Sequence, residues 1–581
     1  MAILVPASDR VHAEKYRGIG EDHRECCNRI ASALQDSHEH YMEFRSTLTK
    51  LRFLPPGRVQ AGAGSLKNVT LYNCFVMATI HDSFVDGPTG DETLVNGQHP
   101  PRSIMHTALD AATTMRQGGG VGYDISTLRP RGDLIRGVQA KTDGPMAFAP
   151  IYDAICQATS SAGNRRGAQM LVLRVDHPDI EEFIRAKHSS RDIPYEYRPF
   201  RGFNFSVAIT DEFMECVQSG KPFALQFGGK KYREVDASAL WEMIMRGTYD
   251  WAEPGVLFID RINQMNNLWY CEKIAATNPC GEQPLPPYGA CLLGSFNLPM
   301  YLRASGGGYE FDFDQLRADI PHVVRAMDNV IDRSRYPLAR QSYEARQKRR
   351  MGLGVTGLAN CIEAIIGKSY GEKQFCHIQG EIQRFITRHC YLASAELAKE
   401  KGPFPLFDKD NYLDGLFVRT LDEDVREAIY RFGIRNSHLT SIAPTGTISF
   451  CANNVSSGIE PVSWYSQERR VKMQSGDVVM QVQDYGVASL GVSGKLTGEV
   501  SAQEHVAVLC EAQKQVDSAV SKTCNVPEDY PYEAFKNLYL MAYENGAKGC
   551  TTYRPNGNYP SVIKEAVEEP LACSITGECA D

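Results

Sequence analysis

The chain has 581 residues, a formal net charge of -8, 43% hydrophobic residues and 23% charged residues. This composition is typical of a soluble globular protein and argues against a nucleic-acid coat protein. No apolar run approaches the roughly 18 residues that span a bilayer, so we expect no membrane segment. The 17 cysteines show no regular framework and no C-x-x-C pair, which argues against a secreted disulfide scaffold and a zinc site. The N-terminus lacks the features of a signal peptide, and we expect a cytosolic, cytoplasmic protein.

The first 130 residues predict helices followed by strands. Residues 1–50 read as helical, with Cys26, Ile30 and Leu34 at helical spacing. Residues 71–77 have the β-branched and aromatic character of a buried strand. A surface loop is expected over 87–101 and a helix over 104–116. The glycine cluster 118–124 suits either close approach to a ligand or tight packing of a helix on a strand. It fits neither a Rossmann fingerprint nor a P-loop.

A basic loop follows over 160–167 and carries Arg165 and Arg166. Two arginines among glycines suit recognition of a phosphate or a base, although a solvated loop is equally consistent with the sequence. We then expect a strand over 169–175, a helix over 179–187, and strands over 203–207 and 255–259. Helix-length segments dominate from 315 to 400. These repeated α and β signals predict an α/β protein with a large central sheet or barrel.

The stretch Asn278-Pro279-Cys280-Gly281-Glu282 carries the clearest chemical signal. Its prolines exclude a helix, and in an extended segment Asn278, Cys280 and Glu282 would share one face. A carboxylate beside a thiol disfavours the thiolate, so a cysteine-protease nucleophile is a poor interpretation. A thiol that gives and takes a hydrogen atom fits better. The alternative is a stiff loop with a structural cysteine.

Two further segments suggest a site. The stretch Ser441 to Ser449 concentrates hydroxyl groups and backbone N–H groups around Gly446, and it would form an anion site if a helix starts at its end. An ordinary turn rich in threonine and serine is the alternative. Near the C-terminus, Cys573 and Cys579 follow an acidic run, where a dithiol could carry reducing equivalents.

Together these motifs resemble the catalytic subunit of ribonucleotide reductases, over about Phe53 to Cys579. The segment 278–285 is similar to the active-site loop of the adenosylcobalamin-dependent class II enzymes. Cys74 in Tyr72-Asn73-Cys74-Phe75, Cys291 in 290–298, and 444–449 are similar to other family motifs, in the family's order. The resemblance implies a ten-stranded α/β barrel with a central finger loop at 51–560, after a helical region at 1–50 and before a flexible redox-active tail at 561–581.

The resemblance also implies roles for individual residues. Cys280 would become a thiyl radical and Glu282 would accept a proton, while Asn278 would bind the substrate hydroxyls. Cys74 and Cys291 would reduce the ribonucleotide. Cys573 and Cys579 would reduce that pair, with thioredoxin or glutaredoxin as partner. The substrate would contact Asn73, Pro444, Thr445, Gly446, Thr447, Ile448 and Ser449, and a dNTP or ATP effector would contact Asp82, Ser83, Arg165 and Arg166. A homodimer is plausible by the same resemblance.

The source of the radical separates the classes of the family. A class I enzyme would use adjacent tyrosines near the C-terminus, where this chain has Thr551 and Thr552. No glycyl-radical element is found. We therefore expect adenosylcobalamin as cofactor, with a class I subunit that needs a metal-bearing partner as the alternative. A nucleotide-binding regulatory protein without chemistry would have lost Cys280, Glu282 or a dithiol partner, and all are intact.

Overall fold

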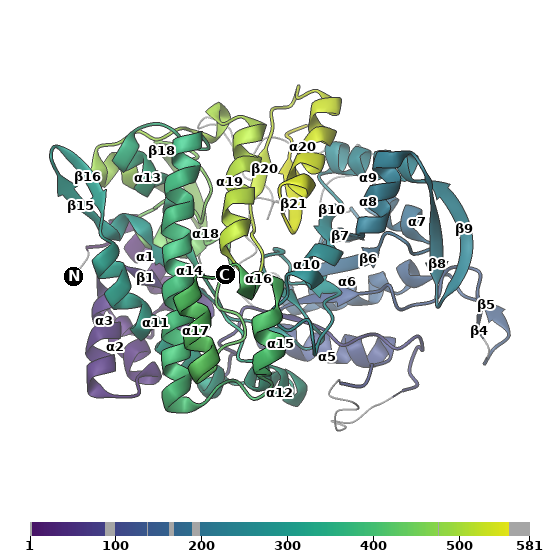
Figure 1. Ribbon diagram of the computed structural model, residues 1–581, viewed down its shortest axis with the longest axis horizontal. Coiled ribbons are helices and arrows are strands. Elements are labelled where there is room, and N and C mark those ends of the chain that lie inside the picture. Colours follow the sequence, from purple (N-terminus) through teal and green to yellow (C-terminus); the bar gives the residue numbers. More distant parts are fainter. Residues whose placement is uncertain are drawn as a thin grey trace.

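Three helices form the N-terminal part of the computed structural model, which describes residues 3–87, 99–135, 137–161, 168–188, 198–473 and 476–556 (Figure 1). Asp22 and Glu25 form a capping box at the start of the second helix, where the Glu25 N–H donates to Asp22 at 2.7 Å. The stripe of Cys26, Ile30 and Leu34 is buried, as its spacing predicts. The helices are α1 (Pro6–Tyr16), α2 (His23–Leu34) and α3 (His38–Thr49).

An eight-stranded sheet occupies the centre and right of Figure 1. Its strands β2, β3, β6, β7 and β10 are parallel, while β13 pairs antiparallel with β2 and β21 pairs antiparallel with β10. Helices connect the parallel strands, as parallel pairing requires. In sheet order the strands are β13 (Ala290–Cys291), β2 (Cys74–Val76), β3 (Gly120–Asp124), β6 (Gln169–Arg174), β7 (Phe203–Ile209), β10 (Gly255–Phe258), β21 (Gly549–Tyr553) and β20 (Thr523–Asn525). The connecting helices are α5 (Ile104–Arg116), α6 (Ala149–Ser161), α7 (Ile180–Arg185), α8 (Asp211–Ser219) and α9 (Ala237–Trp251).

A three-stranded sheet consists of β1 (Phe53–Leu54), β14 (Leu293–Asn297) and β17 (Gly352–Thr356). Single parallel bridges extend its pairing, from Leu353 to Thr440 and from Ile442 to Val520. The fold is therefore a mixed α/β fold, as the sequence predicts. The ten-stranded barrel stays a prediction.

The remaining elements cover these sheets or project from them. The helices are α4 (Gly57–Gly62), α10 (Ile259–Gln264), α11 (Phe313–Arg333), α12 (Ala339–Lys348), α13 (Leu358–Ile366), α14 (Lys373–Lys401), α15 (Lys409–Asp414), α16 (Leu416–Arg419), α17 (Glu423–Phe432), α18 (Gly446–Cys451), α19 (Ala502–Gln515) and α20 (Tyr532–Glu544). The hairpins are β4 (Leu134–Ile135) with β5 (Ala140–Lys141), β8 (Pro222–Phe227) with β9 (Lys230–Asp236), β11 (Ala276–Thr277) with β12 (Pro284–Leu285), β15 (Leu302–Ser305) with β16 (Gly308–Phe311), and β18 (Ser466–Met473) with β19 (Gly476–Gln483).

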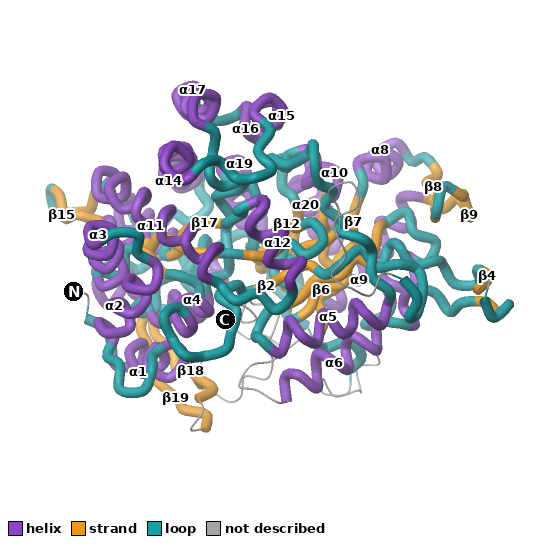
Figure 2. Tube along the Cα trace, turned by 90° about the horizontal axis from the view of Figure 1, so that it is seen from below, coloured by secondary structure: helices purple, strands orange, loops and turns teal. Residues whose placement is uncertain are grey.

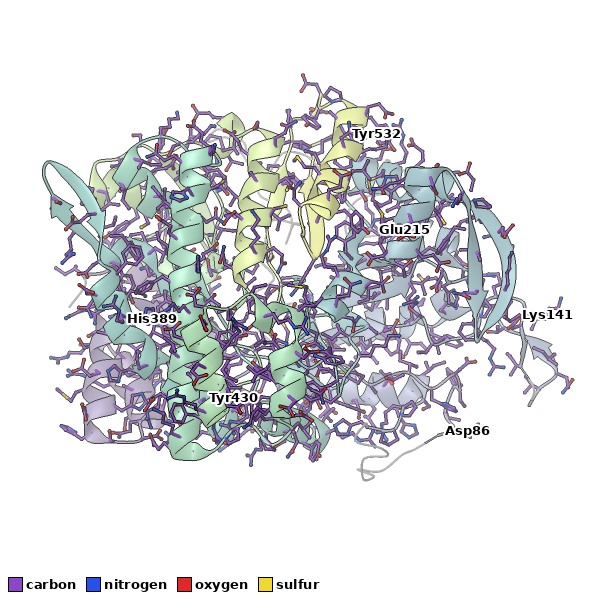
Figure 3. All side chains as sticks on the ribbon, viewed as in Figure 1. Asp86, Lys141, Glu215, His389, Tyr430 and Tyr532 are labelled. Carbon is purple, nitrogen blue, oxygen red and sulfur yellow. The ribbon has the colours of Figure 1, made fainter. Side chains whose placement is uncertain are left out.

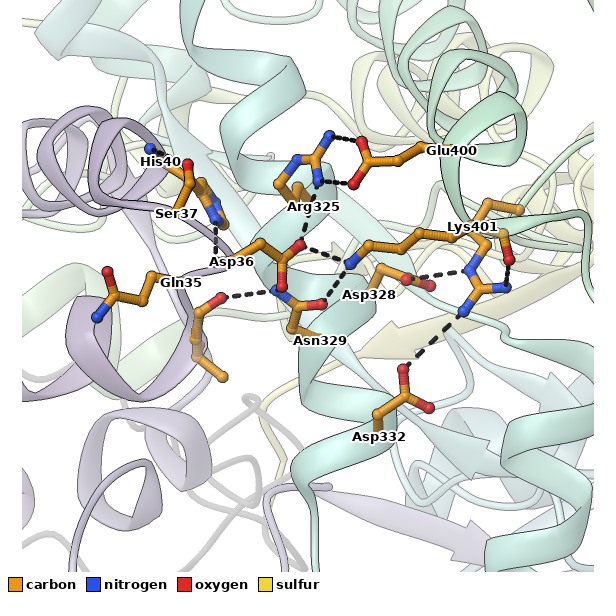
Figure 4. Close-up of polar contacts among 12 residues, drawn as sticks. Gln35, Asp36, Ser37, His40, Arg325, Asp328, Asn329, Asp332, Glu400 and Lys401 are labelled. Atoms are coloured by element: carbon orange, nitrogen blue, oxygen red, sulfur yellow. Dashed lines mark hydrogen bonds and ion pairs between the residues drawn. The ribbon is translucent and has the colours of Figure 1, made fainter.

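Asp36 joins the N-terminal helices to α11 and α14 (Figure 4). Its carboxylate accepts hydrogen bonds from Lys401 at 2.6 Å, Asn329 at 2.8 Å and Arg333 at 3.1 Å, and it also contacts Arg325. Burial works against its charge, but the hydrogen bonds from Lys401 and Arg325 hold the pKa of Asp36 below its ordinary value. Asp36, in the connection between α2 and α3, thus contacts residues that lie 289 to 365 positions further along the chain.

Local structure agrees with the sequence at several elements. The helix predicted over 104–116 has those bounds, and the strand predicted over 71–77 forms over its last part, Cys74–Val76. The glycine cluster serves tight packing, because a Cβ on Gly122 would lie 2.0 Å from the Thr277 carbonyl oxygen. Most of the loop predicted over 87–101 lies outside the described residues. Among the described residues, no helix combines the length and apolar character needed to cross a membrane.

Candidate active site

Cys280 lies at the tip of the β11–β12 hairpin, in a loop of residues 278–283 that we call the Cys280 loop. The Asn278 N–H donates to the Gln283 carbonyl at 3.1 Å, and Asn278 Oδ1 accepts from the Gln283 N–H at 2.9 Å. The chain turns between them, with Gly281 in the left-handed region at φ 82°. The extended geometry expected from the prolines is therefore wrong, because these hydrogen bonds close a tight turn.

Side chains and backbone from other elements hold this loop. Asn204 on β7 donates to the Pro279 carbonyl at 2.8 Å, and the Glu282 carbonyl accepts from the Ala519 N–H at 3.0 Å and from Ser441 Oγ at 3.2 Å. Asn278 and Glu282 are buried, whereas Cys280 is half-buried. The tip thus presents its thiol while its base is fixed.

Cys74 and Cys291 are directly opposite each other on β2 and β13. Opposed residues of antiparallel strands have Cα atoms about 4.5 to 5.5 Å apart, within the range of roughly 4.4 to 6.8 Å that a disulfide needs. Both side chains carry thiols in the structure. A Cβ placed on Gly120 would lie 3.1 Å from Cys74 Sγ and 3.3 Å from Pro279, so this pair lies beside the Cys280 loop.

Burial in this site favours the neutral, protonated forms of the Glu282 carboxyl and the Cys291 thiol. Burial raises the pKa of Glu282 to about 7, and the adjacent Asn278 side chain opposes this shift. Burial, followed by the charges of Glu282, Cys74 and Cys280, raises the pKa of Cys291 well above its ordinary value. The mutual influence of these groups shows that the structure brings together four of the residues predicted from the sequence. A proton acceptor poised near neutrality lies among three thiols.

Several buried polar atoms of this region have no hydrogen-bond partner within the described residues. They include Asn278 Nδ2, Glu282 Oε2 and Asn73 Oδ1. Each buried polar atom left without a partner costs about 1 to 3 kcal/mol. A polar ligand such as a sugar with hydroxyl groups would satisfy them, so these atoms indicate a binding site.

The segment 444–449 leads into helix α18, which begins at Gly446. Thr445 has a left-handed backbone at φ 57°, and its Oγ1 accepts from the Gly458 N–H at 2.6 Å and lies 2.9 Å from Thr356 Oγ1. The N–H groups in the first turn of a helix have no intrahelical acceptor. The strand-to-helix transition that the sequence suggested is present, with the hydroxyl of Thr445 used for structure.

Lys15 is a residue that the sequence reasoning missed. Its Nζ donates to Thr447 Oγ1 at 3.5 Å from helix α1, 432 positions earlier in the chain. Ser8 on the same helix donates to the Phe450 carbonyl at 2.6 Å, which fixes α1 against α18. No local pattern could reveal this cation, because only the fold brings α1 to the 444–449 segment.

Of the residues predicted to bind an effector, the structure describes Asp82 and Ser83. Asp82 is paired with Arg129, whose Nε donates to it at 2.6 Å, and the Ser83 hydroxyl accepts from the Asp86 N–H at 3.2 Å. Figure 3 places Asp86 and Lys141 at the same end of the molecule, beyond the sheet. Arg165 and Arg166 lie outside the described residues, and so do the tail cysteines Cys573 and Cys579.

Thr551 and Thr552 lie on β21, next to β10 in the sheet. Thr551 is exposed, while Thr552 is 1% exposed and its hydroxyl lies 2.8 Å from the Tyr539 hydroxyl. Strand β21 therefore has two threonines at the position where a class I enzyme would have two adjacent tyrosines.

Comparison with known proteins agrees with this arrangement. The family model "Ribonucleotide reductase, barrel domain" matches residues 73–497 and 493–553, and the chain belongs to the ribonucleotide reductase family. A "Vitamin B12-dependent ribonucleoside-diphosphate reductase" of Mycobacterium tuberculosis (strain CDC 1551 / Oshkosh) is 32% identical, over 95% of this chain and 79% of its own length. A protein of the same description from Thermoplasma acidophilum is 30% identical, over 91% of this chain and 67% of its own length.

Proposed function

We propose that this chain reduces ribonucleoside diphosphates to 2′-deoxyribonucleotides by thiyl-radical chemistry, with adenosylcobalamin as the source of the radical. The observation that carries the proposal is the grouping of Cys280, Glu282 and the Cys74–Cys291 pair at one buried site. The B12-dependent relatives support the cofactor, and their names support diphosphate substrates.

The residues of the site divide the reaction between them. The Cys280 thiyl radical takes the 3′ hydrogen atom of the ribose and later returns it. Glu282, in its ionised form, accepts the proton of the 3′-hydroxyl, and the unpartnered Nδ2 of Asn278 donates to the ribose hydroxyls. Cys74 and Cys291 supply two electrons and two protons. One ribonucleotide and two thiols thus give one deoxyribonucleotide, one water and one disulfide.

The tip of the Cys280 loop fits a large radical-generating cofactor. Cys280 is half-buried, and a Cβ on Gly281 would meet no atom within 4 Å other than those of its chain neighbours, so there is open space at Gly281 on the tip of the loop. When bound, adenosylcobalamin supplies an organic radical that can take the hydrogen atom of a thiol. Cys280 and Gly281 are the residues that would face it.

We propose that the 444–449 segment binds the substrate phosphates, with Lys15 adding a positive charge. The groups that would contact the anion are the first-turn N–H groups of α18, the Thr447 hydroxyl and the Lys15 ammonium. The Ser449 hydroxyl donates to the Gly446 carbonyl at 3.0 Å and would support the turn. Asn73 beside Cys74 would contact the sugar.

We propose that strands of the two sheets together form the ten-stranded barrel, with the Cys280 loop as its finger loop. The parallel bridges Leu353–Thr440 and Ile442–Val520 link β17 towards β20, and β13 and β14 are separated by one residue. Bridges therefore extend from one sheet towards the other at one side, and at the other side the chain itself passes from β13 into β14, which supports closure.

Three further assignments belong to the same proposal. Asp82, Ser83, Arg165 and Arg166 would form the effector site, coupled to the active site. Cys573 and Cys579 would reduce the Cys74–Cys291 disulfide and would themselves be reduced by thioredoxin or glutaredoxin. A homodimer would form near the effector site. What supports these assignments is that the chain belongs to the ribonucleotide reductase family.

Reconstitution tests the proposed function. Purified chain with adenosylcobalamin, dithiothreitol, a ribonucleoside diphosphate and a dNTP effector should form deoxyribonucleotide, and Cys280→Ser should abolish it. Cys216→Ser, on helix α8, is the matched control and should retain activity. Turnover that needs a metal-bearing partner protein instead of the cobalamin would contradict the class II assignment.

A further inference from the structure

A cavity of about 570 Å³ lies among helices α10, α14, α16 and α19. Figures 1 and 2 both show α10, α16 and α19 close together. Its volume is within the range of roughly 300 to 1,000 Å³ that small-molecule sites have. Its walls contain no residue of the Cys280 loop or of the 444–449 segment, so it is separate from the substrate site.

The cavity is lined by five basic side chains and one acidic side chain. Arg384 and Arg388 at its edge are paired with Asp422, and Arg388 also contacts Asp424. Lys514 is paired with Glu511 at 2.9 Å. Pairing thus accounts for three of the cations. The other two, Arg261 and Lys548, give the cavity its excess positive charge.

Lys548 is buried, with 4% of its surface exposed. Its ammonium donates to the carbonyls of Asp517 and Ser518, each at 2.6 Å. Burial lowers the pKa of Lys548 to about 8, and the nearby Asp517 carboxylate opposes the shift. That carboxylate already accepts hydrogen bonds from Tyr391 and the Leu439 N–H. A buried ammonium held by carbonyls is stabilised by a neighbouring anion.

Arg261 has similar partners. Its guanidinium donates to the carbonyls of Tyr543 at 2.6 Å and Ala547 at 2.9 Å. Within the described part of the chain, the hydrogen bonds of Arg261 and Lys548 thus go to carbonyl oxygens rather than to carboxylates. The cavity lining also contains the apolar side chains Met265, Phe417 and Leu421. Cations and apolar side chains in one cavity suit a ligand with an anionic part and an apolar part.

A short backbone segment, residues 517–519, connects the cavity residue Lys548 to the Cys280 loop. The carbonyls that hold Lys548 belong to Asp517 and Ser518, and the next residue, Ala519, donates its N–H to the Glu282 carbonyl at 3.0 Å. An anion that attracts the Lys548 ammonium therefore changes its hydrogen bonds to the segment 517–519. That change reaches Glu282 through the hydrogen bond from Ala519.

We propose that this cavity binds a phosphate-bearing small molecule, with its phosphates at Lys548 and Arg261 and its apolar part against Phe417 and Met265, and that binding restrains the Cys280 loop. This site is additional to the substrate and effector sites of the proposed function. Its binding does not depend on catalysis.

Calorimetry with tripolyphosphate and with ATP tests the site, because the two probes share the triphosphate and differ in the nucleoside. The double variant Arg261→Gln/Lys548→Gln should weaken one class of tripolyphosphate binding, the class that belongs to this cavity, by about tenfold. Thr420→Trp, at an exposed wall residue, should block that class for both probes. The control Lys221→Gln/Lys230→Gln removes the same charge from exposed positions and should leave this class unchanged.

Thr447→Val distinguishes phosphate binding in the cavity from phosphate binding at the 444–449 segment. It should leave the affinity of the cavity for tripolyphosphate unchanged. Tighter ATP than tripolyphosphate binding in the same class supports a nucleoside in the apolar part, and equal affinity restricts the ligand to inorganic phosphates. Hydrogen exchange of peptides over 278–285 and 516–521 should slow when the probe binds. Binding that survives both cavity variants, or exchange that does not change in these two peptides, would overturn the proposal.

Discussion

Glu282 combines a buried position with a pKa near neutrality. A carboxyl group that must accept a proton works only when ionised, so the raised pKa of about 7 sets the pH range of the reaction. We expect the rate to rise from pH 6 to pH 8, with its midpoint near 7. Glu282→Gln should lower kcat by about 100-fold or more. The matched control is Glu215→Gln on α8, at an exposed position, which should keep the wild-type profile.

The same group predicts how stability depends on pH. Its pKa is raised in the folded state, so the folded chain binds this proton more tightly than the unfolded chain does. The tighter binding of this proton contributes fully to the free energy of unfolding below pH 4.5, and the contribution is lost as the pH rises through about 7. Urea unfolding should therefore show Glu282→Gln gaining stability relative to wild type between pH 5 and pH 8. A constant difference over that range would contradict the assignment.

Lys15 offers a test of the phosphate segment. Lys15→Met removes a cation that donates to Thr447, so the KM for a ribonucleoside diphosphate should rise by about tenfold while kcat changes little. Lys221→Met, at an exposed position outside the site, is the control and should not change KM. An equal loss in kcat would instead indicate that α1 acts on folding or on the chemical step.

At the scale of elements, the connection between α2 and α3 depends on Asp36. Asp36→Ala leaves Lys401, Arg325 and Arg333 without their shared carboxylate, and we expect a loss of about 2 kcal/mol in the free energy of unfolding. Asp414→Ala breaks an exposed pair with Arg419 and should cost less than about 0.5 kcal/mol. Denaturant unfolding of the three proteins measures both values.

The sequence predicted elements better than it predicted contacts between them. Periodicity and capping residues are local, so the helix Ile104–Arg116 could be placed at its bounds. Cys280 and Glu282 could be identified because their motif is contiguous, while the shape of their loop was mispredicted because its closing hydrogen bonds and the left-handed Gly281 were not considered. Asn204 and Lys15 reach the site from other elements, and nothing in their own neighbourhoods marks them. Ser441 lies in a stretch that the sequence did mark, but its contact with Glu282 depends on the fold.

At the scale of the whole molecule, the proposed redox tail can be separated from the active site. Cys573→Ser/Cys579→Ser should retain turnover with dithiothreitol, because a small dithiol can reduce the Cys74–Cys291 disulfide directly. The same variant should lose turnover with thioredoxin or glutaredoxin. Equal activity of wild type and variant under both reductants would contradict the role of the tail, and parallel assays of initial rate distinguish these outcomes.

The close packing around the Cys280 loop has a consequence for mutational scanning. A methyl group on Gly122 would meet the Thr277 carbonyl oxygen at 2.0 Å, and one on Gly354 would meet the Ser441 carbonyl oxygen at 2.2 Å. Backbone atoms cannot move aside as a flexible side chain can. Every single-codon replacement at these two positions therefore displaces the loop or its support, and a library selected for growth should tolerate as few substitutions there as at Cys280, although glycine contributes no reactive group.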